Sequence, residues 1–150
     1  MKVSTRFSDA IHILAFINIY HGKIPLTSDN IAGSVELSSV MVRKLMSTLK
    51  KAGLLETKSG ASPDPRLAKP AEDISLLDIY LAVEKDKPLF EIDYDTNPQC
   101  IVGGNIQKTL EYYYQEAENA ALAKLNHVSL ADVIETILVK QKQKEAGIQK

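Results

Sequence analysis

The chain has 150 residues, of which 45% are hydrophobic, enough for one domain with a real core or for one domain and an added arm. No apolar run approaches the roughly 18 residues of a membrane-spanning helix, and the acid within the apolar start of the chain argues against a signal peptide. A single cysteine excludes an intramolecular disulfide framework and favours a reducing, cytoplasmic setting.

The charge is unevenly distributed, although the formal net charge is only −1. Residues 1–70 contain ten Lys or Arg and five Asp or Glu, a net +5, whereas residues 71–150 contain eight and 14, a net −6. This asymmetry predicts a basic half that binds an acidic partner such as nucleic acid, and an acidic half with another task.

Residues 4–20 are predicted to form a helix that is apolar nearly all round and therefore buried. We interpret His12 within it as structural, because the sequence offers no second ligand at a metal-site spacing. Thr27 or Ser28 then caps a short helix, SDNIAGSV, and a tight turn follows at residues 36–37.

The next segment, residues 38–55, has the clearest pattern in the chain. Ser38 is a good N-cap, Gly53 is a favourable helix end, and an apolar stripe lies between them. The stripe consists of Val42, Leu45, Met46 and Leu49. The segment is basic, with no acid, which fits either a core helix with a basic outer face or the recognition helix of a helix-turn-helix. In the second interpretation Ser39, Val40, Arg43 and Lys44 face a DNA groove.

The preceding short helix and turn favour the recognition helix. Residues 54–58 and 66–69 are predicted to be short strands separated by the turn-forming segment SGASPDP, which makes a β-hairpin wing. Lys58, Arg66 and Lys69 supply positive charge to that wing. A further helix over residues 74–84, capped by Ser75 with Asp78, completes a predicted DNA-binding domain of residues 1–84.

An irregular linker is predicted for residues 85–104, since two prolines and a Gly-Gly pair interrupt the periodicity. Residues 105–140 are interpreted as dimerisation helices, and residues 141–150 as a polar C-terminal tail. The first of these helices has a near-heptad apolar stripe, and too little of the domain is left to cover it, which favours a dimer. The alternative is that this helix packs back on its own domain. The candidate interface residues are Ile106, Leu110, Tyr113, Tyr114 and Ala117.

Catalysis finds no support, because the sequence has no Gly-rich phosphate loop and its histidines and carboxylates are scattered. Cys100 is a candidate redox sensor if the following helix lowers its pKa, and the alternative is an inert, buried small hydrophobe. A pocket for a small-molecule effector near Phe90, Tyr94 and Tyr112 would look the same in sequence as ordinary core packing.

The order of elements resembles the Rrf2 family of bacterial winged helix-turn-helix transcription regulators, over almost the whole chain. The most specific segments are MKVSTRFSDAIHIL, SSVMVRKLMSTLKKAGLL, RLAKP and ISLLDIYLAVE. The resemblance implies a homodimer on a palindromic operator. It also implies that Ser38, Ser39, Val40, Arg43 and Lys44 lie at the groove, while Thr27, Ser28, Lys58 and Arg66 hold the DNA backbone.

Two departures from the family pattern matter. Many members bind an iron–sulfur cluster through three linker cysteines, whereas this chain has Cys100 alone, so we expect no cluster and no other cofactor. The wing tip also differs, and Asp64 there would repel phosphate.

The sequence therefore predicts a mainly α fold with a small β-hairpin, built as a winged helix-turn-helix domain and a long dimerisation helix. We expect a cytoplasmic homodimeric repressor that is not an enzyme. The alternative is a dimeric winged-helix interaction module that does not read DNA sequence, and the salt dependence of DNA binding distinguishes the two.

Overall fold

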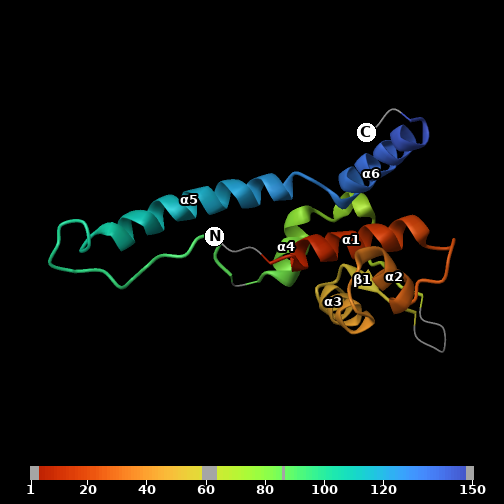
Figure 1. Ribbon diagram of the computed structural model, residues 1–150, viewed down its shortest axis with the longest axis horizontal. Coiled ribbons are helices and arrows are strands. Elements are labelled where there is room, and N and C mark those ends of the chain that lie inside the picture. Colours follow the sequence, from red (N-terminus) through yellow and green to blue (C-terminus); the bar gives the residue numbers. More distant parts are fainter. Residues whose placement is uncertain (1–3, 59–63, 86, 148–150) are drawn as a thin grey trace.

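The computed structural model describes residues 4–58, 64–85 and 87–147. The described residues form six α-helices, one short 3-10 helix and one two-stranded antiparallel sheet, which confirms the predicted fold class (Figure 1). In chain order the elements are α1 (Arg6–Tyr20), α2 (Ser28–Val35), α3 (Ser39–Lys51), β1 (Leu55–Glu56), β2 (Arg66–Leu67), η1 (Ala71–Asp73), α4 (Leu76–Val83), α5 (Ile106–Asn126) and α6 (Leu130–Glu145).

Helix α1 is the centre of the core, as its nearly continuous apolar sequence predicted. Ala10, Ile13, Leu14 and Ile17 are fully buried, and the helix packs against α2, α3, α4 and α6. A helix that is apolar on every side can be satisfied only by neighbours on every side. The other elements of the domain are therefore arranged around α1.

The helix-turn-helix has the boundaries that its capping residues predicted. The Thr27 hydroxyl caps α2 and the Ser38 hydroxyl caps α3, by accepting the backbone N–H groups of Asn30 and Met41. Between the two helices Glu36 is left-handed, with φ 58°, which turns the chain sharply after α2. Gly53 is also left-handed, with φ 77°, and ends the segment after α3.

The wing is a shorter hairpin than the predicted strands 54–58 and 66–69. Only Leu55 and Glu56 pair, with Leu67 and Arg66 respectively. Polar Thr57 and Lys58 already lie outside the ladder, because the sheet has no third strand to extend it. The wing-tip residues 59–63 lie outside the described residues.

Helix α6 begins in the core that surrounds α1. Leu130 is fully buried and Ile134 is 8% exposed, and both belong to the same core cluster as α1. Two backbone hydrogen bonds hold the starts of α4 and α6 together, from Leu76 N to Val128 O (2.8 Å) and from Leu130 N to Ile74 O (2.7 Å). The core therefore extends beyond the predicted boundary at residue 84.

The predicted tail 141–150 is partly wrong, because α6 continues to Glu145. Lys and Gln are good helix formers, and the basic side chains of Lys142 and Lys144 in the last turn are favoured by the helix dipole. Polarity alone is therefore a poor indicator of where this helix ends.

Figure 1 shows that α1 to α4 and the hairpin form a rounded body, from which α5 extends as a long arm. The linker after α4 runs outward beside α5 and turns back at its far end. None of the α5 side chains is fully buried. This helix is therefore the element of the described chain that the domain covers least.

Replacing Leu130 with alanine tests whether α6 belongs to the core. We expect the free energy of unfolding to fall by about 2–5 kcal/mol, as for other fully buried leucines, measured by urea denaturation. Leu138→Ala on the same helix, where the leucine is 44% exposed, is the matched control and should cost less. A loss below about 1 kcal/mol for Leu130→Ala would contradict this packing.

Candidate nucleic-acid interface

The two sides of α3 have opposite character. Val42, Leu45 and Leu49 are buried against the domain core, which turns the opposite side of the helix to solvent. Val40 lies on that side with 53% of its surface exposed, and Arg43 and Lys44 are exposed beside it. Three of the residues predicted to face a DNA groove thus share one accessible surface.

Ser39, the fourth residue predicted to face the groove, has a partner within the protein. Its hydroxyl donates a hydrogen bond to the Asp29 carboxylate of α2, and the side chain is only half-exposed. The contact ties the two helices of the motif together. Sequence reasoning missed this pair, although an acid in the first turn of α2 is a favourable position in itself.

The start of α2 presents hydroxyl groups beside the wing. Thr27 Oγ1 accepts a hydrogen bond from the backbone N–H of Asn30 (3.1 Å), so its own O–H remains able to donate to another acceptor. Thr27 and Ser28 line an open cavity of about 680 Å³, together with Met46 of α3 and Asp64 of the wing. The start of a helix with free hydroxyl groups suits an anionic oxygen such as a phosphate.

Two basic side chains at the base of the wing, Lys50 and Arg66, already have partners within the protein. Arg66 Nε donates to Glu56 Oε1 (2.8 Å) across the two-stranded sheet, and Lys50 Nζ donates to Thr57 Oγ1 (2.7 Å), which links α3 to the wing. Both side chains of the Arg66–Glu56 pair are about half exposed. Exposed pairs of this kind contribute at most about 1 kcal/mol, so Arg66 can exchange its partner cheaply.

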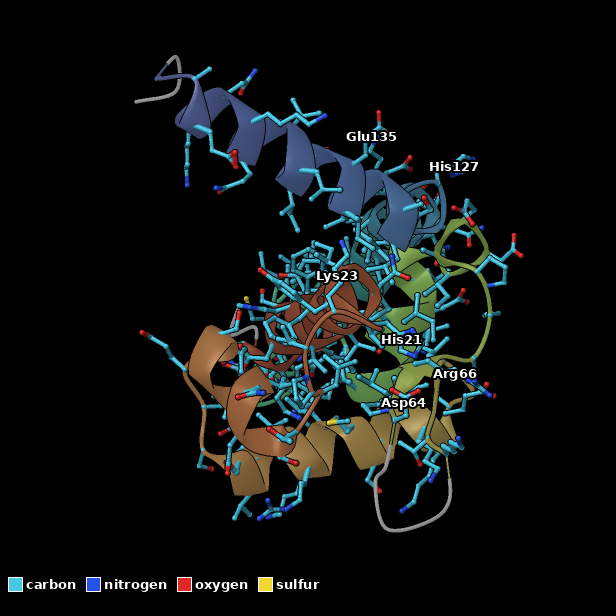
Figure 2. The ribbon with its side chains drawn as sticks, turned by 90° about the vertical axis from the view of Figure 1, so that its right-hand side faces the viewer. His21, Lys23, Asp64, Arg66, His127 and Glu135 are labelled. Carbon is cyan, nitrogen blue, oxygen red and sulfur yellow. The ribbon has the colours of Figure 1, made fainter. Side chains whose placement is uncertain are left out.

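Asp64, which is predicted to repel phosphate, lies beside a histidine. Its Oδ2 is 3.2 Å from His21 Nε2 at the end of α1, and Figure 2 shows His21, Asp64 and Arg66 gathered near the base of the wing. No local pattern could reveal this contact, because the two residues are 43 positions apart. His12 likewise bonds Ser34 of α2, at 2.7 Å.

The residues predicted to form a dimer interface lie along α5 with differing exposure. Ile106, Leu110 and Tyr114 are half-buried, and Ala117 is exposed. Tyr113 is 60% exposed. Tyr114 packs against Phe90 of the linker, with ring centroids 5.3 Å apart. An apolar stripe of this kind is incompletely covered by its own chain.

The thiol of Cys100 is exposed, so its interpretation as a buried hydrophobe is wrong. The backbone N–H groups of Gly103 and, to a lesser extent, Val102 lower its pKa by hydrogen bonding to sulfur. Helix α5 begins only at Ile106, so these two peptide groups, and not the start of that helix, cause the shift. The pKa of Cys100 is therefore lowered, as expected, but by the peptide groups of Gly103 and Val102 and not by the following helix.

The remaining chemistry in the described residues is sparse. No group of three or more His, Cys, Asp or Glu side chains in residues 4–58, 64–85 and 87–147 is placed to hold a metal ion. Within the same ranges, no helix is both long and apolar enough to cross a membrane. The arrangement on α2, α3 and the wing therefore carries the strongest functional signal.

The chain is similar to known transcriptional regulators. The family model Rrf2, described as an iron-dependent transcriptional regulator, matches residues 3–136. YwnA of Bacillus subtilis, by its name an HTH-type transcriptional regulator, is 38% identical over 132 residues, which are 88% of this chain and 96% of YwnA. Protein rrf2 of Nitratidesulfovibrio vulgaris is 31% identical over 135 residues, 89% of this chain and 87% of that protein.

A solved structure shows the same fold at a similar level of identity. A crystal structure described as a DNA binding protein is 37% identical and covers 86% of this chain and 98% of its own, with a TM-score of 0.69. The fold and the sequence therefore point to one family.

The iron in the family description does not fit the donor set of this chain. An iron–sulfur cluster is normally held by about four ligands, mostly cysteine thiolates. Cys100 is the one cysteine of the sequence, and it has no group of metal-binding side chains around it among the described residues. A single thiolate of this kind cannot replace the missing ligands.

Membership rests on the family match over most of the chain, on relatives above 30% identity and on the shared fold. Members of this family are transcriptional regulators, not enzymes. The chain belongs to the Rrf2 family of transcriptional regulators.

Proposed function

We propose that this protein is a sequence-specific DNA-binding repressor that binds a palindromic operator as a homodimer. The observation that carries the proposal is the outer side of α3, where Val40, Arg43 and Lys44 are exposed while the opposite side is fixed in the core. The name of the related structure at 37% identity, a DNA binding protein, supports the same assignment.

In this proposal α3 enters the major groove. The Arg43 guanidinium can bond a guanine through two parallel N–H groups, Val40 can contact a thymine methyl group, and Lys44 can neutralise a neighbouring phosphate. Ser38 caps the helix at the groove, and Ser39 keeps α3 aligned with α2 through Asp29. Arg43 and Val40 would thus discriminate between DNA sequences, and the hydroxyl groups of Ser38 and Ser39 would hold α3 in place.

The backbone of the DNA is contacted by the flanking elements in the same proposal. Thr27 and Ser28, at the start of α2, donate hydrogen bonds from their hydroxyl groups to one phosphate. Lys58 and Arg66 approach a second phosphate from the wing. Asp64 opposes this contact, although its Oδ2 lies 3.2 Å from His21 Nε2 and so already has a partner within the protein. Such phosphate contacts set affinity and register, and carry little sequence information.

The exposure of α5 supports a homodimer. Ile106, Leu110, Tyr113 and Ala117 recur at spacings of four and three residues, which is the pattern of a helix that packs along another helix. Tyr114 widens this stripe. Pairing two copies through α5 would present two α3 helices to two half-sites, which is why the operator is expected to be palindromic. We propose a repressor because a dimer bound over a promoter would block access to that DNA.

We also propose Cys100 as a redox-sensitive site of this regulator. The thiolate is the reactive form of cysteine, and the lowered pKa of Cys100 enriches it at neutral pH. A peroxide would convert the thiolate to a sulfenic acid, with the peroxide O–O bond broken and its second oxygen released as alkoxide or hydroxide.

Arg43→Ala and Lys44→Ala test the placement of α3. We expect Arg43→Ala to weaken operator binding by about 1–3 kcal/mol and to relax the preference at one base pair, whereas Lys44→Ala should weaken binding to all sequences and reduce the salt slope by about 1. Fluorescence anisotropy at several salt concentrations measures both effects. Lys124→Ala, which removes one positive charge from exposed α5, is the matched control. Unchanged affinity in both α3 variants, or a flat salt response, would favour the interaction module instead.

Ala117→Glu tests the dimer. A carboxylate in the apolar stripe must lose its hydration when two copies pair, so we expect sedimentation velocity to show a monomer where the unaltered chain is a dimer. Gln115→Glu introduces the same charge two residues earlier, on the opposite side of the helix, and should leave the dimer intact. A dimer that survives Ala117→Glu, or a monomeric unaltered chain, would contradict the proposal.

Cys100→Ser tests the redox site. We expect peroxide to change the operator affinity of the unaltered chain and not that of the variant. Because the pKa is lowered, thiolate persists to more acidic pH than in an ordinary cysteine, and iodoacetamide alkylation should retain half its maximal rate at a lower pH than in the urea-unfolded chain. An equal peroxide response in both proteins, or identical alkylation profiles, would rule out this role.

A further inference from the structure

Glu84, just after α4, is the one buried charged side chain among the described residues. Only 5% of its surface is exposed. It follows directly on the buried Val83, and its backbone N–H bonds Tyr80 O (2.8 Å), as in a last helical turn. A carboxylate in such a position loses most of its hydration and needs partners within the protein or from a ligand.

The two carboxylate oxygens of Glu84 are not equally satisfied. Oε2 is 3.7 Å from Lys87 Nζ, an ion pair whose lysine is 64% exposed. Oε1 is buried and has no hydrogen-bond partner among the described residues. Since a buried acceptor without a donor is costly, Oε1 marks a place where a donor is missing.

A cavity of about 380 Å³ is present at this position. The end of α4 forms one wall through Tyr80 and Glu84, and the linker forms another through Pro88, Leu89 and Glu91. Ser4, before α1, closes a third side. The cavity therefore combines an apolar wall with the side chain of a buried glutamate.

The charge around this cavity is negative. Among the described residues that line it, Glu84 and Glu91 are acidic and Lys87 is the one base. The pKa of Tyr80 is raised, first by burial and then by the charges of Glu118 and Glu84, so a carboxylate of α5 also acts on this region. An anionic ligand would be repelled here, and a cationic one would be attracted.

We propose that this cavity binds a small organic cation, a primary ammonium group with a short apolar chain. The ammonium group donates a hydrogen bond to the Glu84 carboxylate, and the chain packs against Pro88 and Leu89. An organic cation fits better than a metal ion, because no group of three His, Cys, Asp or Glu side chains in the described residues could hold a metal, and hard cations need several oxygen ligands. Binding of this cation does not depend on DNA binding.

The test uses n-butylammonium chloride as the probe, with the full-length protein and amide chemical shifts from nuclear magnetic resonance. We expect saturable shifts at residues 80–91. The control probe is n-butanol, which has the same apolar chain without the charge and should bind about tenfold more weakly or not at all. Equal shifts from the two probes, or no saturable shift from either, would overturn the proposal.

Two variants test the role of Glu84 with opposite expected signs. Glu84→Gln keeps the shape and removes the charge, so it should weaken n-butylammonium binding about tenfold or more. Lys87→Ala removes the competing ammonium from Oε2 and should tighten binding about threefold. Lys85→Ala, an exposed neighbour with the same loss of charge, is the matched control and should change affinity by less than about twofold.

The Lys87→Ala result keeps the test decisive if Glu84→Gln fails to fold, which circular dichroism would show. Tighter binding in Lys87→Ala than in Lys85→Ala supports the site. Unchanged or weaker binding in Lys87→Ala, or unweakened binding in a folded Glu84→Gln protein, would contradict it.

Discussion

Burial of the apolar side of α3 against the central helix α1 is the constraint on which the rest of the structure depends. Val42, Leu45 and Leu49 are almost completely removed from water, and each contributes about 1.5–3 kcal/mol through that burial. Because a helix cannot turn one side inward without turning the other outward, this packing fixes where Arg43 and Lys44 point. The candidate DNA-reading surface is therefore a consequence of the core.

Three acids of the same body lie beside partners within the protein. Asp29 accepts from Ser39, Glu56 pairs with Arg66, and Asp64 lies beside His21. Residues 1–70 remain basic in spite of these acids, and the acidic residues 71–150 cancel that charge. The net charge of the whole chain therefore says little about its partner. The Arg66–Glu56 pair is exposed, so its weak attraction can give way to the phosphates of a duplex.

Local sequence rules predicted the helices well, because their caps are local interactions. Ser38 and Ser75 each cap the helix for which they were predicted as caps. The contacts that were missed are long-range: His21 with Asp64, and Leu130 in the core of a domain expected to end at residue 84. No periodicity encodes such pairs. The resemblance to the Rrf2 family supplied the overall fold, while the exposure of Cys100 and the buried oxygen of Glu84 depend on packing in three dimensions.

In the mechanism that we propose, the protein reads DNA sequence through α3, two copies at a time. The most direct test is to incubate the purified, folded protein with fragmented genomic DNA at moderate salt and to sequence the bound fragments. We predict one enriched motif with two-fold symmetry, whose half-sites lie one helical turn or a multiple of it apart. Bound fragments without any shared motif, from a protein shown to be folded, would contradict this mechanism.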